Sequence, residues 1–130
     1  MMVSRLEYSM THEVSFASSE ISLLFFTNEQ HIKIKGNKFS SLKDFSAKNF
    51  QNHNLTLTKG SFVVMCTDGV KDQFGGQENK KLKSSGKIQM VKRALMSDKF
   101  EKSQALARFI DEWKGSNDQT DDITIFGWGV

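Results

Sequence analysis

Carboxylates stand at the ends of two predicted strands, where they could bind a metal ion. Asp68 follows the apolar run 61–66 and precedes Gly69, so we expect its side chain at a sheet end beside a sharp turn. Asp121 and Asp122 directly precede the last apolar run of the chain. Such oxygen ligands hold hard divalent cations and leave waters for a substrate phosphate. Acidic residues are also common in ordinary turns and caps, so the spacing alone leaves both interpretations open.

The remaining residues that could do chemistry form no recognisable site. His12, His31 and His53 lack the spacing of a zinc site or a proton relay, and we expect them at the surface. Cys66 ends an apolar run with no histidine partner nearby in sequence, which favours a buried structural thiol over a nucleophile. As the single cysteine, it excludes an internal disulfide framework and a cysteine-based zinc site.

Alternating or continuous apolar runs predict the strands that position these carboxylates. The predicted strands span residues 13–17, 21–26, 31–35, 54–58, 61–66 and 123–128. A four-residue connection predicts a hairpin between the second and third strands, and a turn at Lys59-Gly60 predicts another between the fourth and fifth. Residues 38–50 are polar with scattered aromatic residues, and we expect a loop there.

Two helices are predicted before the last strand. The first spans about residues 86–96, and Ser97-Asp98 are candidate caps for the second. In the second helix, helical spacing places four apolar residues on one face, and Gly115 is a suitable stop; these residues are Leu106, Phe109, Ile110 and Trp113. The element order predicts an α+β fold, an antiparallel sheet with the two helices on one face, rather than a βαβ repeat.

Composition predicts one globular domain over residues 1–130, with 38% hydrophobic and 25% charged residues. No apolar run has the roughly 20 residues of a spanning helix, and no signal-peptide pattern is present, so we expect a cytoplasmic protein with no membrane partner. Residues 31–60 carry six Lys and one Asp, which would suit nucleic acid. Because these lysines alternate with apolar residues as on solvated faces, we expect no nucleic-acid partner and keep that function as a lesser alternative.

Several separated motifs agree in order and spacing with one known family. The segment 59–76, which holds Thr-Asp-Gly and Asp-Gln-Phe-Gly-Gly, is followed by Phe109-x-x-x-Trp113-Lys114-Gly115 and by Gln119-Thr120-Asp121-Asp122-Ile123-Thr124. Together they resemble the C-terminal half of a SpoIIE-like, PPM-type (protein phosphatase 2C family) serine/threonine phosphatase domain. Phe16–Ser19 and Ile32–Asn37 resemble its preceding strands more loosely, so the resemblance runs from about residue 12 to the end.

The resemblance implies a two-metal chemistry. In that family two Mn²⁺ or Mg²⁺ ions activate a bridging water, which attacks a serine or threonine phosphate in line. By position, Asp68 and Asp121 match metal-ligand aspartates, Asp72 matches a residue that can serve a weaker accessory metal, and Asp122 stands beside the ligands. Substrates of the SpoIIE-like branch, which belongs to bacterial signalling, are typically phosphorylated anti-sigma-factor antagonists.

Family motifs expected upstream are not found in this sequence. The family has an acidic residue ahead of an Asp-Gly, then a Gly-His-Gly loop; here the one Asp before Asp68 is Asp44, and Phe45 follows it. Two ligand positions cannot hold two divalent ions tightly, since each ion takes about six oxygens. We therefore expect weak Mn²⁺ or Mg²⁺ binding and a non-catalytic binding or dimerisation module. The alternative is a metal-dependent serine/threonine phosphatase whose site a second chain completes.

The resemblance also predicts partners. Half of the family's αββα sandwich would expose one face of a sheet, and the eleven Phe fit such a face. We expect a homodimer that completes the sandwich, with a phosphoprotein or a STAS-type anti-sigma antagonist as a second candidate partner.

Overall fold

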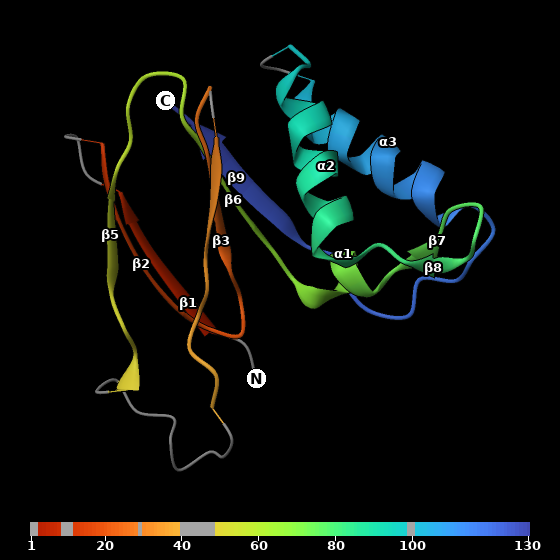
Figure 1. The fold of residues 1–130 in the computed structure, drawn as a ribbon, viewed down its shortest axis with the longest axis horizontal. Coiled ribbons are helices and arrows are strands. Elements are labelled where there is room, and N and C mark those ends of the chain that lie inside the picture. The colour runs from red at the N-terminus through yellow and green to blue at the C-terminus, as the bar shows by residue number, and fades with distance from the viewer. Residues whose placement is uncertain (1–2, 9–11, 29, 40–48, 99–100) are drawn as a thin grey trace. The chain divides into compact units, whose positions relative to one another are not determined.

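A computed structural model describes residues 3–8, 12–28, 30–39, 49–98 and 101–130 (Figure 1). The chain divides into two compact units. One comprises residues 1–66 with 125–130 and consists of strands, and the other comprises residues 67–124 and holds all the described helices. The mixed α+β class with antiparallel sheets is therefore confirmed.

The strand unit contains two antiparallel sheets. One has the order β1-β2-β5 and the other the order β4-β3-β6-β9. The strands are β1 (Val3–Tyr8), β2 (Glu13–Ser19), β3 (Leu23–Phe26), β4 (His31–Ile34), β5 (His53–Thr56), β6 (Phe62–Cys66) and β9 (Ile125–Gly129). The six predicted strands are present with shifted ends, whereas β1 was not predicted.

The two predicted hairpins have different outcomes. The β3–β4 hairpin is confirmed, with Leu23 opposite Ile34 and Phe26 opposite His31. The hairpin predicted across Lys59-Gly60 is wrong, because β5 pairs with β2 while β6 pairs with β3 and β9. The chain leaves one sheet after β5 and enters the other at β6, so this turn connects two sheets rather than two neighbouring strands.

The core of the strand unit lies between the two sheets. Val14 and Phe16 of β2 are fully buried against Leu23 of β3 and Val63 of β6, and Leu57 joins them. Strands β2, β3 and β6 each contribute alternate residues to this cluster, as expected for sheets that pack face to face. The strand unit thus supplies both layers of a sandwich, whereas the sequence predicted one sheet with an exposed Phe-rich face.

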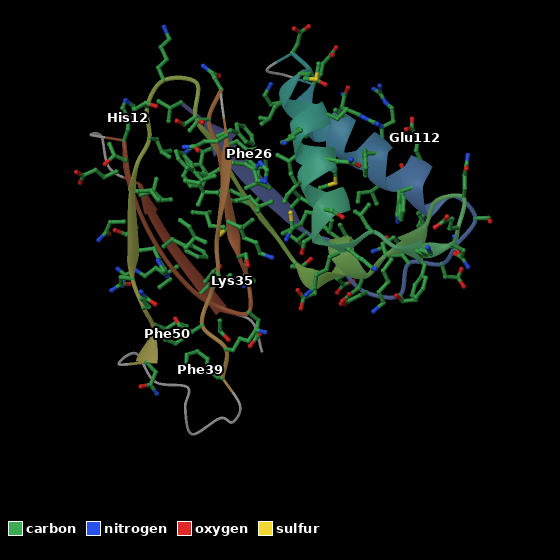
Figure 2. All side chains as sticks on the ribbon, in the orientation of Figure 1. His12, Phe26, Lys35, Phe39, Phe50 and Glu112 are labelled. Atoms are coloured by element: carbon green, nitrogen blue, oxygen red, sulfur yellow. The ribbon has the colours of Figure 1, made fainter. Side chains whose placement is uncertain are left out.

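The ends of the segment predicted as a loop are partly described. Phe39 and Phe50 pack edge to face with ring centroids 5.1 Å apart, and Figure 2 shows them side by side. Residues 40–48, which include Asp44 and Phe45, lie outside the described residues.

The helical unit contains α1 (Asp68–Asp72), a small β7 (Phe74–Gly75) and β8 (Lys80–Lys81) ribbon, α2 (Lys83–Leu95) and α3 (Lys102–Lys114). Helices α2 and α3 are confirmed, although α2 starts three residues before the predicted start. The cap predicted at Ser97-Asp98 is wrong, because Glu101 occupies the N-cap position of α3 and makes no side-chain cap hydrogen bond. Gly115 does end α3, with a φ of 55° that favours glycine.

Helices α2 and α3 pack against each other, and the buried Ile110 lies on the apolar face that the spacing predicted for α3. Met90, Val91 and Ala94 of α2 and Ile110 of α3 are buried, and the Arg93 guanidinium lies 5.2 Å from the centre of the Phe109 ring. The exposed side of α3 is polar, as Glu112 illustrates in Figure 2. Within the described residues, none of the helices has the length and apolar character that crossing a membrane requires.

Candidate metal site

Thr67 connects the two acidic turns that the sequence singled out. Its hydroxyl donates a hydrogen bond to the backbone carbonyl of Asp122 over 3.1 Å, and the same oxygen accepts one from the Thr124 N–H over 3.0 Å. The Thr67 N–H donates to the Thr124 carbonyl over 3.0 Å. These three bonds fix the residue before Asp68 against the segment that follows Asp121. The structure therefore brings the two acidic turns together through their backbones.

Gly69 makes this approach possible. A Cβ atom at this position would lie 2.2 Å from the Asp122 carbonyl oxygen and 2.9 Å from its carbonyl carbon. No side chain fits there without a backbone shift. The glycine that follows Asp68 is therefore needed for packing as well as for a turn. It lets the first turn of α1 lie against the chain at Asp122.

The acidic turn itself is held by local hydrogen bonds. A carboxylate oxygen of Asp121 accepts a bond from the Asp122 N–H over 2.8 Å, and the Gln119 side-chain amide donates to the Asp121 carbonyl over 3.0 Å. Both aspartates are exposed. Their carboxylates remain at the surface while the backbone of the turn is fixed.

Gln73 secures the other end of the acidic turn. Its side chain is 2% exposed and its amide nitrogen donates to the carbonyls of Phe74 and Asp118, both over 3.0 Å. Its own backbone carbonyl accepts a bond from the Trp113 indole N–H over 2.9 Å. One buried residue therefore connects the end of α1 with α3 and the chain at Asp118.

The Gly75-Gly76 pair packs against Trp113. A Cβ atom at Gly75 would lie 1.9 Å from the Trp113 carbonyl oxygen, and one at Gly76 would lie 2.7 Å from the indole ring. The Gly76 N–H donates to that carbonyl over 2.9 Å. The pair thus allows β7 to meet the end of α3.

Lysines accompany two of the four predicted aspartates. The Lys71 ammonium lies 3.3 Å from a carboxylate oxygen of Asp68, one helical turn away, and their side chains are 40% and 38% exposed. The Lys81 ammonium lies 3.5 Å from a carboxylate oxygen of Asp72. At this exposure each pair contributes little to stability, but each places a positive charge where a cation would bind.

The comparisons with known proteins agree with the resemblance. The family model for Stage II sporulation protein E (SpoIIE) matches residues 9–128. The chain belongs to the SpoIIE family. Among solved structures, the SiaA-PP2C domain of Pseudomonas aeruginosa is 26% identical with a TM-score of 0.78, covering 92% of this chain and 46% of that one. No curated protein sequence matched the chain.

Two further solved structures share the fold at lower identity. The Mn-presoaked phosphatase domain of SpoIIE from Bacillus subtilis is 13% identical with a TM-score of 0.63, covering 99% of this chain and 56% of that one. The photosystem II phosphatase PBCP is 17% identical with a TM-score of 0.60, covering 85% and 44%. This SpoIIE-family chain therefore spans about half the length of the solved structures it resembles. It is a phosphatase-like domain of the SpoIIE/PP2C type.

The described residues do not supply a complete metal site. Across the described ranges, no three His, Cys, Asp or Glu side chains gather closely enough to hold a metal ion. A pair of Mn²⁺ or Mg²⁺ ions takes about six oxygen ligands each, which Asp68 and Asp121 alone cannot provide. The assignment of Asp68, Asp72, Asp121 and Asp122 to metal binding in this SpoIIE-family chain remains a prediction.

Cys66, His12 and His31 lie where the sequence predicted them, whereas His53 is less exposed than expected. Cys66 is buried as a free thiol at the end of β6, and His12 and His31 are exposed. His53 is half-buried, with its ring centre 6.3 Å from that of Phe16.

The hydrogen bonds by which Thr67, Gln73 and Trp113 support the site were not predicted from the sequence. Thr67 carried a local signal, a hydroxyl residue directly before an Asp-Gly turn, which is where capping and turn hydrogen bonds form. Gln73 and Trp113 both stand in motifs that carry the family resemblance, but nothing in the sequence predicted the bond between them, because it links residues 40 positions apart and depends on the tertiary fold.

Proposed function

We propose that this chain is a phosphatase-like module that does not hydrolyse phosphate esters by itself and acts by binding. Its partners are a second copy of the chain or a phosphoprotein, such as a STAS-type anti-sigma antagonist. The family membership and the likeness to phosphatase domains support the phosphatase-like part of the proposal. Bacterial signalling through a phosphoprotein follows from the resemblance.

One observation carries the non-catalytic part. Among the described residues, no cluster of three potential metal ligands exists, and Asp68 and Asp72 each pair with a lysine. A bridging water between two ions needs a carboxylate that ligates both of them, together with several further oxygens. In the described part of this chain, the carboxylates on the two neighbouring turns have no cluster of three possible metal ligands around them.

The test is hydrolysis of a phosphoserine peptide by the purified chain with millimolar Mn²⁺. We expect no release of phosphate above that of Mn²⁺ alone. Asp68→Ala tests the site, and Asp111→Ala, an exposed aspartate on α3, is the matched control. Turnover that Asp68→Ala abolishes and Asp111→Ala leaves intact would overturn the proposal.

A second candidate is a metal-dependent serine/threonine phosphatase whose remaining ligands come from another chain. The observation that favours it is the contact of Thr67 and Gly69 with Asp122, which fixes the two acidic turns against each other. Such a preformed part-site should bind Mn²⁺ weakly, and Asp121→Ala should reduce that binding. Calorimetry with millimolar Mn²⁺ decides: no heat of binding would exclude this second candidate.

A further inference from the structure

Strand β9 forms one edge of the four-stranded sheet, and its outer backbone groups face no described strand. The Val130 N–H donates to the Ser61 carbonyl over 3.0 Å, which extends the β6–β9 ladder. Because antiparallel ladders alternate, the backbone groups of Phe126 and Trp128 also point toward β6. Those of Ile125, Gly127 and Gly129 therefore point away from the sheet, each with one donor and one acceptor.

This edge lacks the charged side chains that two of the other edge strands carry. Strand β4, at the opposite edge of the same sheet, carries Lys33, and β1, at an edge of the other sheet, carries Arg5. Strand β9 reads Ile-Phe-Gly-Trp-Gly and has no charged or hydrophilic side chain. Natural proteins block exposed edges with lysine, proline or bulges, and an unblocked apolar edge pairs readily with another strand.

The inner face of β9 also carries an exposed aromatic residue. Phe126 lies opposite Met65 and Trp128 opposite Val63 in the β6–β9 register, on the side that contains the core between the sheets. Trp128 is partly buried there, whereas Phe126 is 53% exposed, with the two ring centres 5.7 Å apart. The core of the sandwich thus continues past Trp128 to an aromatic side chain that is half open to solvent.

We infer that β9 is a homodimer interface, at which β9 of a second copy pairs with it antiparallel about a two-fold axis at Gly127. The inference rests on the proposed binding function and names the surface that carries it. In this register Ile125 faces Gly129 of the second copy, so all the outward N–H and C=O groups find partners. The four-stranded sheet then continues across the axis into its copy.

The strand is self-complementary in this register. Phe126 lies opposite Trp128 of the second copy on the inner face, and cross-strand aromatic pairs of this kind are stabilising. On the outer face the bulky Ile125 meets a glycine. No like charges meet across the axis, since β9 carries none. These properties favour a second copy over an unrelated strand as the occupant.

The Phe62 ring packs against both glycines of β9. A Cβ atom at Gly129 would lie 2.7 Å from the Phe62 ring, and one at Gly127 would lie 3.1 Å from it. The ring of Phe62 thus covers both glycines from the outer face. A five-residue strand pair is a small interface, so we expect a dissociation constant in the micromolar range.

Sedimentation of the full 130-residue chain tests the interface, with Phe126→Lys as the disrupting variant and Ile32→Lys as its control. Ile32 lies on the opposite edge strand and is 44% exposed, so both variants place a lysine at an exposed apolar position of the same sheet. We expect the wild-type chain and Ile32→Lys to dimerise, and Phe126→Lys to weaken dimerisation at least about tenfold. Circular dichroism checks that both variants fold.

Hydrogen exchange tests the register. In the dimer the amides of Ile125, Gly127 and Gly129 should be protected, and in Phe126→Lys they should exchange rapidly, while the Trp128 amide stays protected in both. A wild-type chain that is monomeric at about 200 µM overturns the inference and leaves the edge to a strand of another protein. Dimerisation that Phe126→Lys does not weaken also overturns it. Phosphopeptide hydrolysis by a dimeric chain would instead overturn the proposed function alone.

Discussion

The hydroxyl of Thr67 donates a hydrogen bond to the backbone carbonyl of Asp122 across 55 positions of sequence. This bond, with the two that join Thr67 to Thr124, holds the acidic turn against the start of α1. The carboxylates of Asp68 and Asp121 are exposed or half-exposed, so they contribute little to this arrangement themselves. The hydrogen bonds that join the two turns therefore come from the Thr67 hydroxyl and from backbone groups, not from the carboxylates.

Replacing Thr67 with Val should lower the free energy of unfolding by about 1–2 kcal/mol, because the Asp122 carbonyl and the Thr124 N–H both lose their side-chain partner. Urea denaturation measures the change. Thr67→Ser keeps the hydroxyl and should lose less than half as much. Equal losses in the two variants would show that the methyl group, rather than the hydrogen bonds, stabilises the turn.

Gly69→Ala should destabilise the chain by about 2 kcal/mol or more, since the new methyl group would overlap the Asp122 carbonyl. Thermal unfolding measures the loss. Ser85→Ala, at an exposed position within α2, is the control and should change stability by less than about 0.5 kcal/mol. A neutral Gly69→Ala would mean that the turn at Asp122 moves freely away from α1.

Local patterns predicted the elements better than their pairing. The β3–β4 hairpin and the apolar face of α3 follow from short-range signals, a tight connection and a helical repeat. The pairing of β5 with β2 depends on contacts about 40 residues apart, such as Ser15 with Asn54. Alternation of polar and apolar residues predicts a strand with one buried face, but not the strand with which it pairs. The turn at Lys59-Gly60 therefore predicted a hairpin where the chain changes sheets.

Short elements and tertiary supports of the site could not be predicted from the sequence. Helix α1 has five residues and the strands β7 and β8 have two each, too few for a periodic pattern. The acidic turns were found because carboxylates and glycine are conspicuous in a sequence. Gln73 stands in the Asp-Gln-Phe-Gly-Gly motif, but its burial and its bonds to Asp118 and Trp113 depend on the tertiary fold.

Gln73→Leu should lower the free energy of unfolding by about 1–3 kcal/mol, because it leaves the carbonyls of Phe74 and Asp118 without the amide donor. The loss should be largest locally, so hydrogen exchange over residues 115–121 should accelerate in the variant. Gln89→Leu on α2 is the matched control, since Gln89 is exposed. A variant as stable as wild type, with unchanged exchange, would show that Gln73 does not hold the acidic turn.

Phe16→Ala should destabilise the chain by about 3–5 kcal/mol, a loss comparable with the total stability of many small domains. Phe16 is fully buried between the two sheets, so its removal leaves a cavity that close-packed neighbours cannot fill. Phe126→Ala should lose less than half as much, because Phe126 is 53% exposed. Denaturant unfolding at a protein concentration that keeps the chain monomeric compares the two. Equal losses of free energy in the two variants would contradict the assignment of Phe16 to the buried core and of Phe126 to an exposed edge strand.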